Sequence, residues 1–133
     1  MIPERIKPAL QGVFPAHIVT CSMEGMPNIA SLSQVWYVDE THIALSHQFF
    51  NKTSKNLREN PLAFVKVLDP DSFMYWDLEV VYLRTETEGS IFQEMTVKLE
   101  AIATLMGFEG VFHLKGADIY RVVSVNECME DWE

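Results

Sequence analysis

The sequence predicts a mainly β protein with helices (α+β), organised as an antiparallel β-barrel capped by one long helix. Six segments have the alternation or the short apolar runs of strands, and turn-forming residues separate them at hairpin spacing. Only one segment combines helical periodicity with helical length. Strands do not alternate with helices, and the sequence contains no Gly-x-Gly-x-x-Gly fingerprint, which excludes a parallel dinucleotide-binding sheet.

The composition is that of a globular protein, with 133 residues that suit one domain over 1–133, 48% apolar residues and 22% charged residues. A net charge of −9 repels nucleic acid. The apolar runs are far shorter than the roughly 20 residues that span a bilayer. Cys21 and Cys128 form neither a disulfide framework nor the paired spacing of a zinc site. We therefore expect a soluble, cytoplasmic protein without nucleic-acid or membrane partners.

The strand signals are clearest between residues 74 and 86. Trp76 and Leu78 alternate there with Asp77 and Glu79, which predicts one buried and one solvated face. Gly25 marks the bend of an earlier hairpin. The expected strands are 17–21, 28–38, 42–46, 62–68, 74–86 and 117–125.

Two helices are expected to pack on this sheet. The first, over 2–11, has to be short or bent because it contains Pro8. The second is the long helix, in which Ser90 and Gln93 form a capping box and Gly107 ends the last turn. Its apolar face recurs at steps of three and four residues and comprises Phe92, Met95, Leu99, Ile102 and Met106.

A short polar helix over 51–60 stands out because it is basic in an acidic chain. It carries Lys52, Lys55 and Arg58, together with Asn51, Thr53 and Ser54. Ammonium groups, hydroxyls and the free N–H groups of a helix N-terminus together suit a phosphate monoester. The same pattern is also typical of a solvated helix face with a polar cap, so both interpretations stay open.

The second expected strand contains small polar residues in a stretch that otherwise suits the core. A buried hydroxyl without a partner costs about 1–3 kcal/mol, so Ser31, Ser33 and Gln34 need the backbone, water or a ligand. Small side chains would also let a flat ring lie close to the strand. The alternative is that these side chains face solvent on one side of the sheet.

Other chemistry-bearing residues indicate no site. The four histidines, His17, His42, His47 and His113, are too far apart in sequence to predict a metal centre, and we expect no metal. No Ser-His-Asp or Cys-His arrangement is visible, and no catalytic residue can be named.

The order and spacing of several segments resemble the FMN-binding core of pyridoxamine 5′-phosphate oxidase-like proteins. The resemblance covers roughly residues 13 to 125, nearly the whole chain, and no single motif carries it. Its most specific part is the Asn51-Lys52-Thr53 segment followed by the Asn60-Pro61 entry into the next strand. The segments that carry it are 28–36, 38–40, 43–46, 49–57 and 60–65.

The resemblance implies a six-stranded antiparallel Greek-key split β-barrel that forms a homodimer with FMN at the interface. It places the FMN phosphate at Lys52 and Thr53, beside Asn51. Backbone groups of 33–35 would face the polar edge of the flavin, and Trp76 and Tyr82 would lie in the core or at the dimer interface, where they could stack on the partner's flavin. The implied contacts of the ribityl chain and isoalloxazine are Ser31, Leu32, Ser33, Gln34, Val35, Ser46 and His47.

Three departures indicate that this chain is not a pyridoxamine phosphate oxidase. Ser31 stands where the true oxidase has an arginine at the start of the strand motif, and Trp36 stands where the oxidase has a lysine that faces its vitamin substrate. The C-terminal segment is acidic, whereas the oxidase has an arginine motif there. The expected function is therefore that of an FMN-dependent oxidoreductase, which transfers hydride or electrons between NAD(P)H or a small reduced substrate and an acceptor. The alternatives are a non-catalytic flavin-binding or sensory module and a barrel that uses a deazaflavin or haem.

Overall fold

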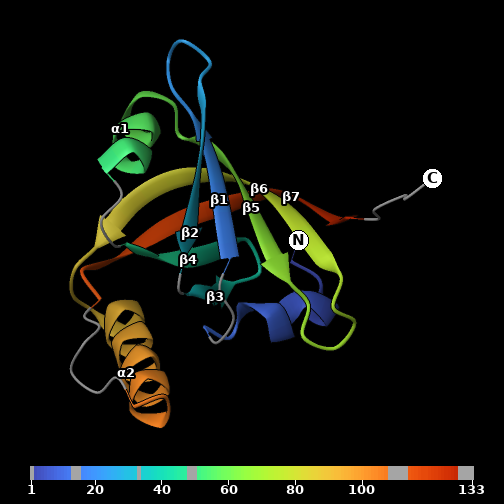
Figure 1. The fold of residues 1–133 in the computed structure, drawn as a ribbon, viewed down its shortest axis with the longest axis vertical. Coiled ribbons are helices and arrows are strands. Elements are labelled where there is room, and N and C mark those ends of the chain that lie inside the picture. The colour runs from blue at the N-terminus through green and yellow to red at the C-terminus, as the bar shows by residue number, and fades with distance from the viewer. Residues whose placement is uncertain (1, 13–15, 33, 48–50, 108–113, 129–133) are drawn as a thin grey trace.

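The computed structural model describes residues 2–12, 16–32, 34–47, 51–107 and 114–128. In these ranges the chain is mainly β, with three helices beside one sheet of seven antiparallel strands (Figure 1). The order across the sheet is β2-β1-β5-β6-β7-β4-β3. The strands are β1 Ala16–Cys21, β2 Pro27–Leu32, β3 Val35–Asp39, β4 His42–His47, β5 Leu62–Leu68, β6 Tyr75–Glu86 and β7 Gly116–Cys128.

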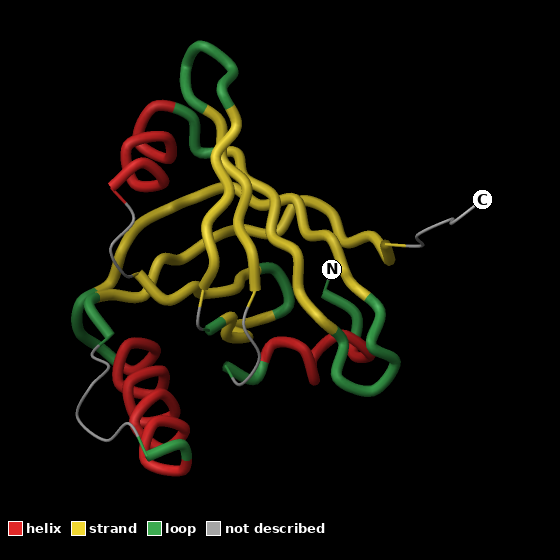
Figure 2. Tube along the Cα trace, in the orientation of Figure 1, coloured by secondary structure: helices red, strands yellow, loops and turns green. Residues whose placement is uncertain are grey.

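The expectation of six strands was wrong because the single strand expected over 28–38 is divided into β2 and β3. β2 pairs with β1 at one edge of the sheet, whereas β3 pairs with β4 at the other. Gln34 lies between them with its side chain fully buried, and its Nε2 donates to the carbonyl oxygens of Gly12 (3.4 Å) and Met95 (3.3 Å). The chain therefore passes from one edge of the sheet to the other within two residues, and the sheet is curled (Figure 2).

The first helix, η1 (Glu4–Leu10), is a 3₁₀ helix that contains Pro8, in agreement with the expected short or bent helix. Its apolar residues Ile6, Ala9 and Leu10 are buried in the main core. That core fills the inside of the curled sheet with side chains such as Ile18, Val65 and Leu78. The helix therefore closes one open side of the core.

The helix α2 (Ser90–Leu105) packs on the sheet with Met95, Leu99 and Ala103, which form a second core cluster that includes Ala44 of β4 and Ile119 of β7. The expected burial of Met106 was wrong, because its side chain is 64% exposed where the helix ends beyond this contact.

The predicted capping box of α2 is also absent. Ser90 is the first helical residue, the N-cap is Gly89, and no side chain caps the helix. The N–H of Gln93 donates to the carbonyl of Gly89 (3.0 Å), so a backbone oxygen accepts the hydrogen bond that was expected to go to the hydroxyl of Ser90. Gly107 follows the last turn with φ +79°, as predicted for a helix end.

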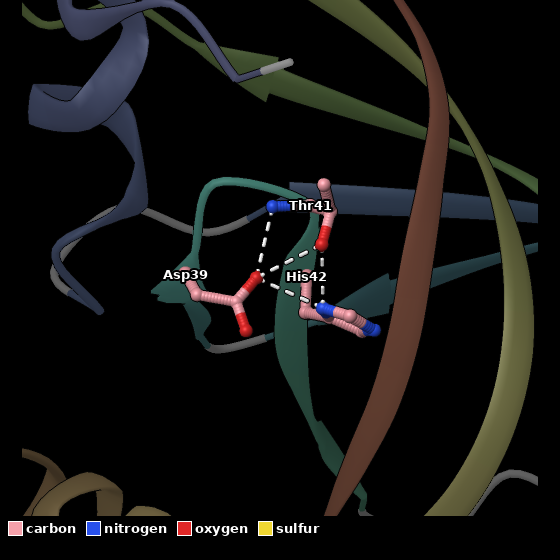
Figure 3. Close-up of polar contacts among 3 residues, drawn as sticks. All are labelled: Asp39, Thr41 and His42. Carbon is pink, nitrogen blue, oxygen red and sulfur yellow. Dashed lines mark hydrogen bonds and ion pairs between the residues drawn. The ribbon is translucent and has the colours of Figure 1, made fainter.

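The turn between β3 and β4 is held by one carboxylate oxygen (Figure 3). Oδ1 of Asp39 accepts from the backbone N–H of Thr41 (2.8 Å) and from its hydroxyl (3.1 Å), and lies 2.8 Å from Nδ1 of His42. The N–H of Thr41 is the main cause that lowers the pKa of Asp39 below its usual value. His42 thus belongs to the turn, which is a structural role.

No helix in the described ranges is both long enough and apolar enough to cross a membrane.

Candidate functional site

The helix α1 (Asn51–Glu59) begins shortly after β4 and lies beside the β1–β2 hairpin (Figure 1). Two side-chain bonds fix this position. Asn28 of β2 donates from Nδ2 to Oγ1 of Thr53 (3.0 Å), and Asn56 donates from Nδ2 to Oγ1 of the buried Thr20 in β1 (3.1 Å). Its polar residues thus serve two purposes, since Thr53 and Asn56 are buried against the sheet while Lys55 and Arg58 are exposed.

The predicted cofactor residues lie on β2, β3, β4 and α1 or directly beside them, and the structure joins α1 to β2 through Thr53, which is bonded to Asn28 near the start of that strand. Ser31 is exposed, Thr53 is buried and His47 is partly buried. Ser33 lies outside the described residues, and only the backbone positions of Leu32, Asn51 and Lys52 are described. The remaining members of the predicted set, Gln34, Val35 and Ser46, are fully buried.

Backbone groups that the resemblance directs at a flavin are bonded within the chain. The N–H of Gln34 donates to Oγ of Ser46 (3.2 Å), and the N–H of Ser46 donates to the carbonyl of Gln34 (3.3 Å). The carbonyl of Val35 accepts from the N–H of Gly12 (2.9 Å). The first two bonds join the residue before β3 to the end of β4, and the third joins the start of β3 to Gly12, so a cofactor would have to exchange with them in order to use the same groups.

Two polar groups of the predicted set keep bonding capacity that a cofactor could use. Oε1 of Gln34 is buried and has no hydrogen-bond partner among the described residues, which is costly for an amide oxygen. Oγ1 of Thr53 accepts from Asn28, so its own hydrogen remains to be donated. The first turn of α1 adds backbone N–H groups that have no partner inside the helix. At the start of α1, the residues present therefore fit a phosphate.

A polar network that the sequence did not reveal joins the ends of β4, β6 and β7. Nδ1 of His47 lies 3.1 Å from Oδ2 of Asp118, and the hydroxyl of Thr85 donates to Oδ1 of Asp118 (2.5 Å). The hydroxyl of Tyr82 lies 2.6 Å from Oγ1 of Thr85. Because the single hydrogen of Thr85 goes to the carboxylate, Tyr82 is the donor to Thr85. An ionised Asp118 likewise only accepts, so Nδ1 of His47 carries a hydrogen.

This network is largely shielded from water. The side chain of Asp118 is 7% exposed and that of His47 is 29% exposed. Tyr120 lies behind it, in edge contact with Tyr82 at a centroid distance of 5.5 Å. Burial, followed by the nearby charge of Asp118, raises the pKa of Tyr120 well above its usual value. Because 71 positions separate His47 from Asp118, no spacing motif could have identified the pair.

Gly116 makes the close approach of these strands possible. A Cβ at this position would lie 2.8 Å from Cγ2 of Thr85 and 3.5 Å from Cβ of His47. Gly116 is the register partner of His47 in the β4–β7 pair. The absence of a side chain therefore allows Thr85 and His47 to reach the same carboxylate.

The aromatic residues named from the sequence have separate positions. Trp76 lies in the core, which was one of the two locations expected for it. Its Nε1 donates to Oδ2 of Asp69 (3.3 Å). Trp36 is partly buried and packs beside α2. Its ring lies so close to Gly12 that a Cβ there would be 2.8 Å from Cε3 of Trp36. No group of three His, Cys, Asp or Glu side chains able to hold a metal occurs in the part of the chain that the structure describes.

Comparison with known proteins gives matches to solved structures alone: no family model and no curated protein matches the chain. An FMN-binding protein from Syntrophomonas wolfei subsp. wolfei matches with a TM-score of 0.78 at 18% identity, over 96% of this chain and 86% of that one. An F420 reductase matches with a TM-score of 0.68 at 15% identity, over 94% and 98%. The haem storage protein HutZ from Vibrio cholerae matches with a TM-score of 0.60 at 14% identity, over 96% and 95%.

Identities this low establish a common fold and leave the ligand open, and the three proteins are indeed described by three different cofactors. Other matched structures are pyridoxamine 5′-phosphate oxidase-like proteins. The resemblance noted in the sequence is thus confirmed for the architecture: this chain has the fold of the pyridoxamine 5′-phosphate oxidase-like FMN-binding proteins.

Proposed function

We propose that this chain is an FMN-binding flavoprotein that works as a homodimer and transfers hydride or electrons. The observation that supports this best is the bond between Asn28 of β2 and Thr53, because it sets the start of α1 against one of the strands that the resemblance assigns to the cofactor. These two residues lie 25 positions apart in sequence. The fold that brings them together is shared with an FMN-binding protein.

In this proposal the start of α1 binds the phosphate. Thr53 donates its hydroxyl hydrogen while Asn28 holds its oxygen in place, and Lys52 supplies the positive charge. The first-turn N–H groups and the helix dipole favour the same dianion. A charge on Lys52 matters more than usual here, because Ser31 stands where, by the resemblance, the true pyridoxamine phosphate oxidase has an arginine.

The ribityl chain and the ring would follow Ser31 to Val35 and the end of β4, at Ser46 and His47. Bound FMN would supply the hydride chemistry, and the protein would orient it and exclude water. NAD(P)H or a small reduced substrate is the proposed donor. Ser46 and Gln34 stiffen the strand ends on which the ring would lie, through their reciprocal backbone and side-chain bonds.

The test is retention of FMN by the purified dimer, measured by the absorbance spectrum and by quenching of flavin fluorescence. Lys52→Ala removes a charge-assisted phosphate contact and is expected to weaken FMN binding by roughly 30-fold, enough to lose the flavin on gel filtration. Lys55→Ala is the matched control, because it removes the same charge from the exposed side of the same helix. Unquenched flavin with the wild-type protein, or equal retention by both variants, contradicts the proposal.

A second candidate is a deazaflavin in place of FMN, favoured by the similarity to an F420 reductase. Titration of the flavin-free protein with each cofactor separates the two, because only the cognate cofactor should saturate the site at stoichiometric concentration. Turnover then separates an enzyme from a sensory module: an enzyme consumes NAD(P)H repeatedly, whereas a binding module consumes at most one equivalent per bound cofactor.

A further inference from the structure

A cavity of about 180 Å³ lies between α1 and the polar network at the ends of β4, β6 and β7. His47, Tyr82, Thr85 and Asp118 form its wall on the side of the sheet, and Leu57 lies in its lining. The helix contributes Ser54 and Arg58, which are four residues apart and therefore on one face of α1. Thr53 does not line this cavity and is bonded to β2, although Leu57, one turn after it, lies in the lining.

The charges around this cavity leave one cation without a counter-charge. In the ranges that the structure describes, Arg58 forms no ion pair, although the chain has 19 acidic and 10 basic residues. The carboxylate of Asp118 accepts from Thr85 and His47 instead of from Arg58.

The hydrogen-bond donors that face the cavity come from the helix. The hydroxyl hydrogen of Tyr82 goes to Thr85 and that of Thr85 goes to Asp118, so neither is available to a ligand. Ser54 offers a hydroxyl, and Arg58 offers a planar fork of N–H groups that matches the two oxygens of a carboxylate.

Size and charge together define the ligand. A volume of about 180 Å³ equals roughly six water molecules, which is too small for a flavin or a dinucleotide. A phosphate dianion is disfavoured because Asp118 is part of the same wall. A short apolar chain can lie on Leu57, whose side chain is buried.

We propose that this cavity binds the carboxylate of a small organic acid, with Arg58 and Ser54 as the donors. This binding does not depend on a flavin. If FMN binds as proposed above, the acid lies beside the cofactor, because His47 belongs to both sets, and it is then a candidate substrate; this last step rests on the proposed function.

The experiment is a titration of the flavin-free protein with propionate, and in parallel with propionamide as its uncharged isostere. Binding is monitored through the ¹H–¹⁵N chemical shifts of the α1 resonances. Propionate is expected to shift Ser54 and Arg58 and propionamide to leave them unchanged. Arg58→Gln should weaken propionate binding by about tenfold or more, because it removes a charge-assisted pair. Lys55→Gln, which removes the same charge from the same helix away from the cavity, should bind like the wild type.

Equal shifts with propionamide, equal binding by Arg58→Gln and Lys55→Gln, or no shift with up to about 50 mM propionate overturns the proposal. The flavin proposal is unaffected by each of these results, since Lys52→Ala tests it separately.

Discussion

Strand β4 has a histidine at each end, and each histidine lies beside an aspartate. At the start of the strand, Nδ1 of His42 lies 2.8 Å from Asp39, three residues away, and the side chains are 28% and 56% exposed. At the other end, Nδ1 of His47 lies 3.1 Å from Asp118, whose side chain is 7% exposed and which belongs to another strand. The shorter pair is the more exposed one.

The difference shows that the distance between two side chains does not by itself determine how much such a pair contributes to stability. Asp39 holds a turn whose residues are neighbours in sequence, and water can replace each of its bonds. Asp118 joins β4, β6 and β7 where water is largely excluded, so its lost bonds cannot be replaced. One pair therefore belongs to a local turn, and the other to the tertiary structure.

The same substitution at both ends gives the largest expected contrast. Asp118→Asn leaves one carbonyl oxygen for two donors and places an amide N–H₂ against them, and we expect the free energy of unfolding to fall by about 2–3 kcal/mol. Asp39→Asn keeps an oxygen for the N–H of Thr41 and should cost about 0.5 kcal/mol. Urea unfolding of the two variants measures the contrast, and equal losses would mean that burial does not separate the pairs.

A smaller effect is expected from Gly116→Ala, which adds a Cβ 2.8 Å from Cγ2 of Thr85. Pushing Thr85 away from Asp118 should lower the free energy of unfolding by about 1–2 kcal/mol. Thr85→Ser lacks the methyl group that collides and keeps the hydroxyl that donates. In a double-mutant cycle, Thr85→Ser should therefore recover most of the loss, and purely additive effects would contradict this explanation.

The smallest expected effect is on the free energy of unfolding at acid pH, and it concerns the exposed pair of Asp39 and His42. The pKa of Asp39 is lowered in the folded protein, so the ionised carboxylate contributes to stability above its unfolded value of 3.8, and this contribution is lost as the pH falls through the lower folded pKa. Asp39→Asn should flatten the acid limb of the stability curve below about pH 4 by a few tenths of a kcal/mol. The pKa of Asp69 is also lowered, mainly by the N–H of Asp71. Asp69 should therefore still make the variant lose stability at acid pH, which accounts for the part of the acid limb that remains. An unchanged limb in the variant would show that the turn does not depend on the ionised form.

Most of the sheet could be predicted from the sequence, because alternation along a strand depends on neighbouring residues only. The strands β1, β4, β5, β6 and β7 begin and end within three residues of the expected positions. The division into β2 and β3 could not be predicted, since Gln34 leaves the strand for acceptors on Gly12 and Met95, which are 22 and 61 positions away. The capping box failed for a local reason: Gly89 lets the helix begin one residue earlier than a serine cap would allow.

The candidate site was predicted in part. Residues that follow a strand or begin a helix, such as His47 and Thr53, were identified by position along the chain. The partners that give them their chemistry were not, because Asn28 and Asp118 are 25 and 71 positions away from the residues they bind. The basic segment 51–60 was identified as one unit, whereas the fold directs Thr53 toward β2 and Arg58 toward a separate cavity.

The two outer strands of the sheet, β2 and β3, are consecutive in the chain, with residues 33 and 34 between them. Pulling one edge away from the core therefore strains the other through this short connection. A ligand seated on residues 31–35 would hold both edges at once, and amide protons throughout the sheet should then exchange more slowly with solvent. Occupancy of the site could thus be measured far from the ligand, as slower exchange of amide protons throughout the sheet.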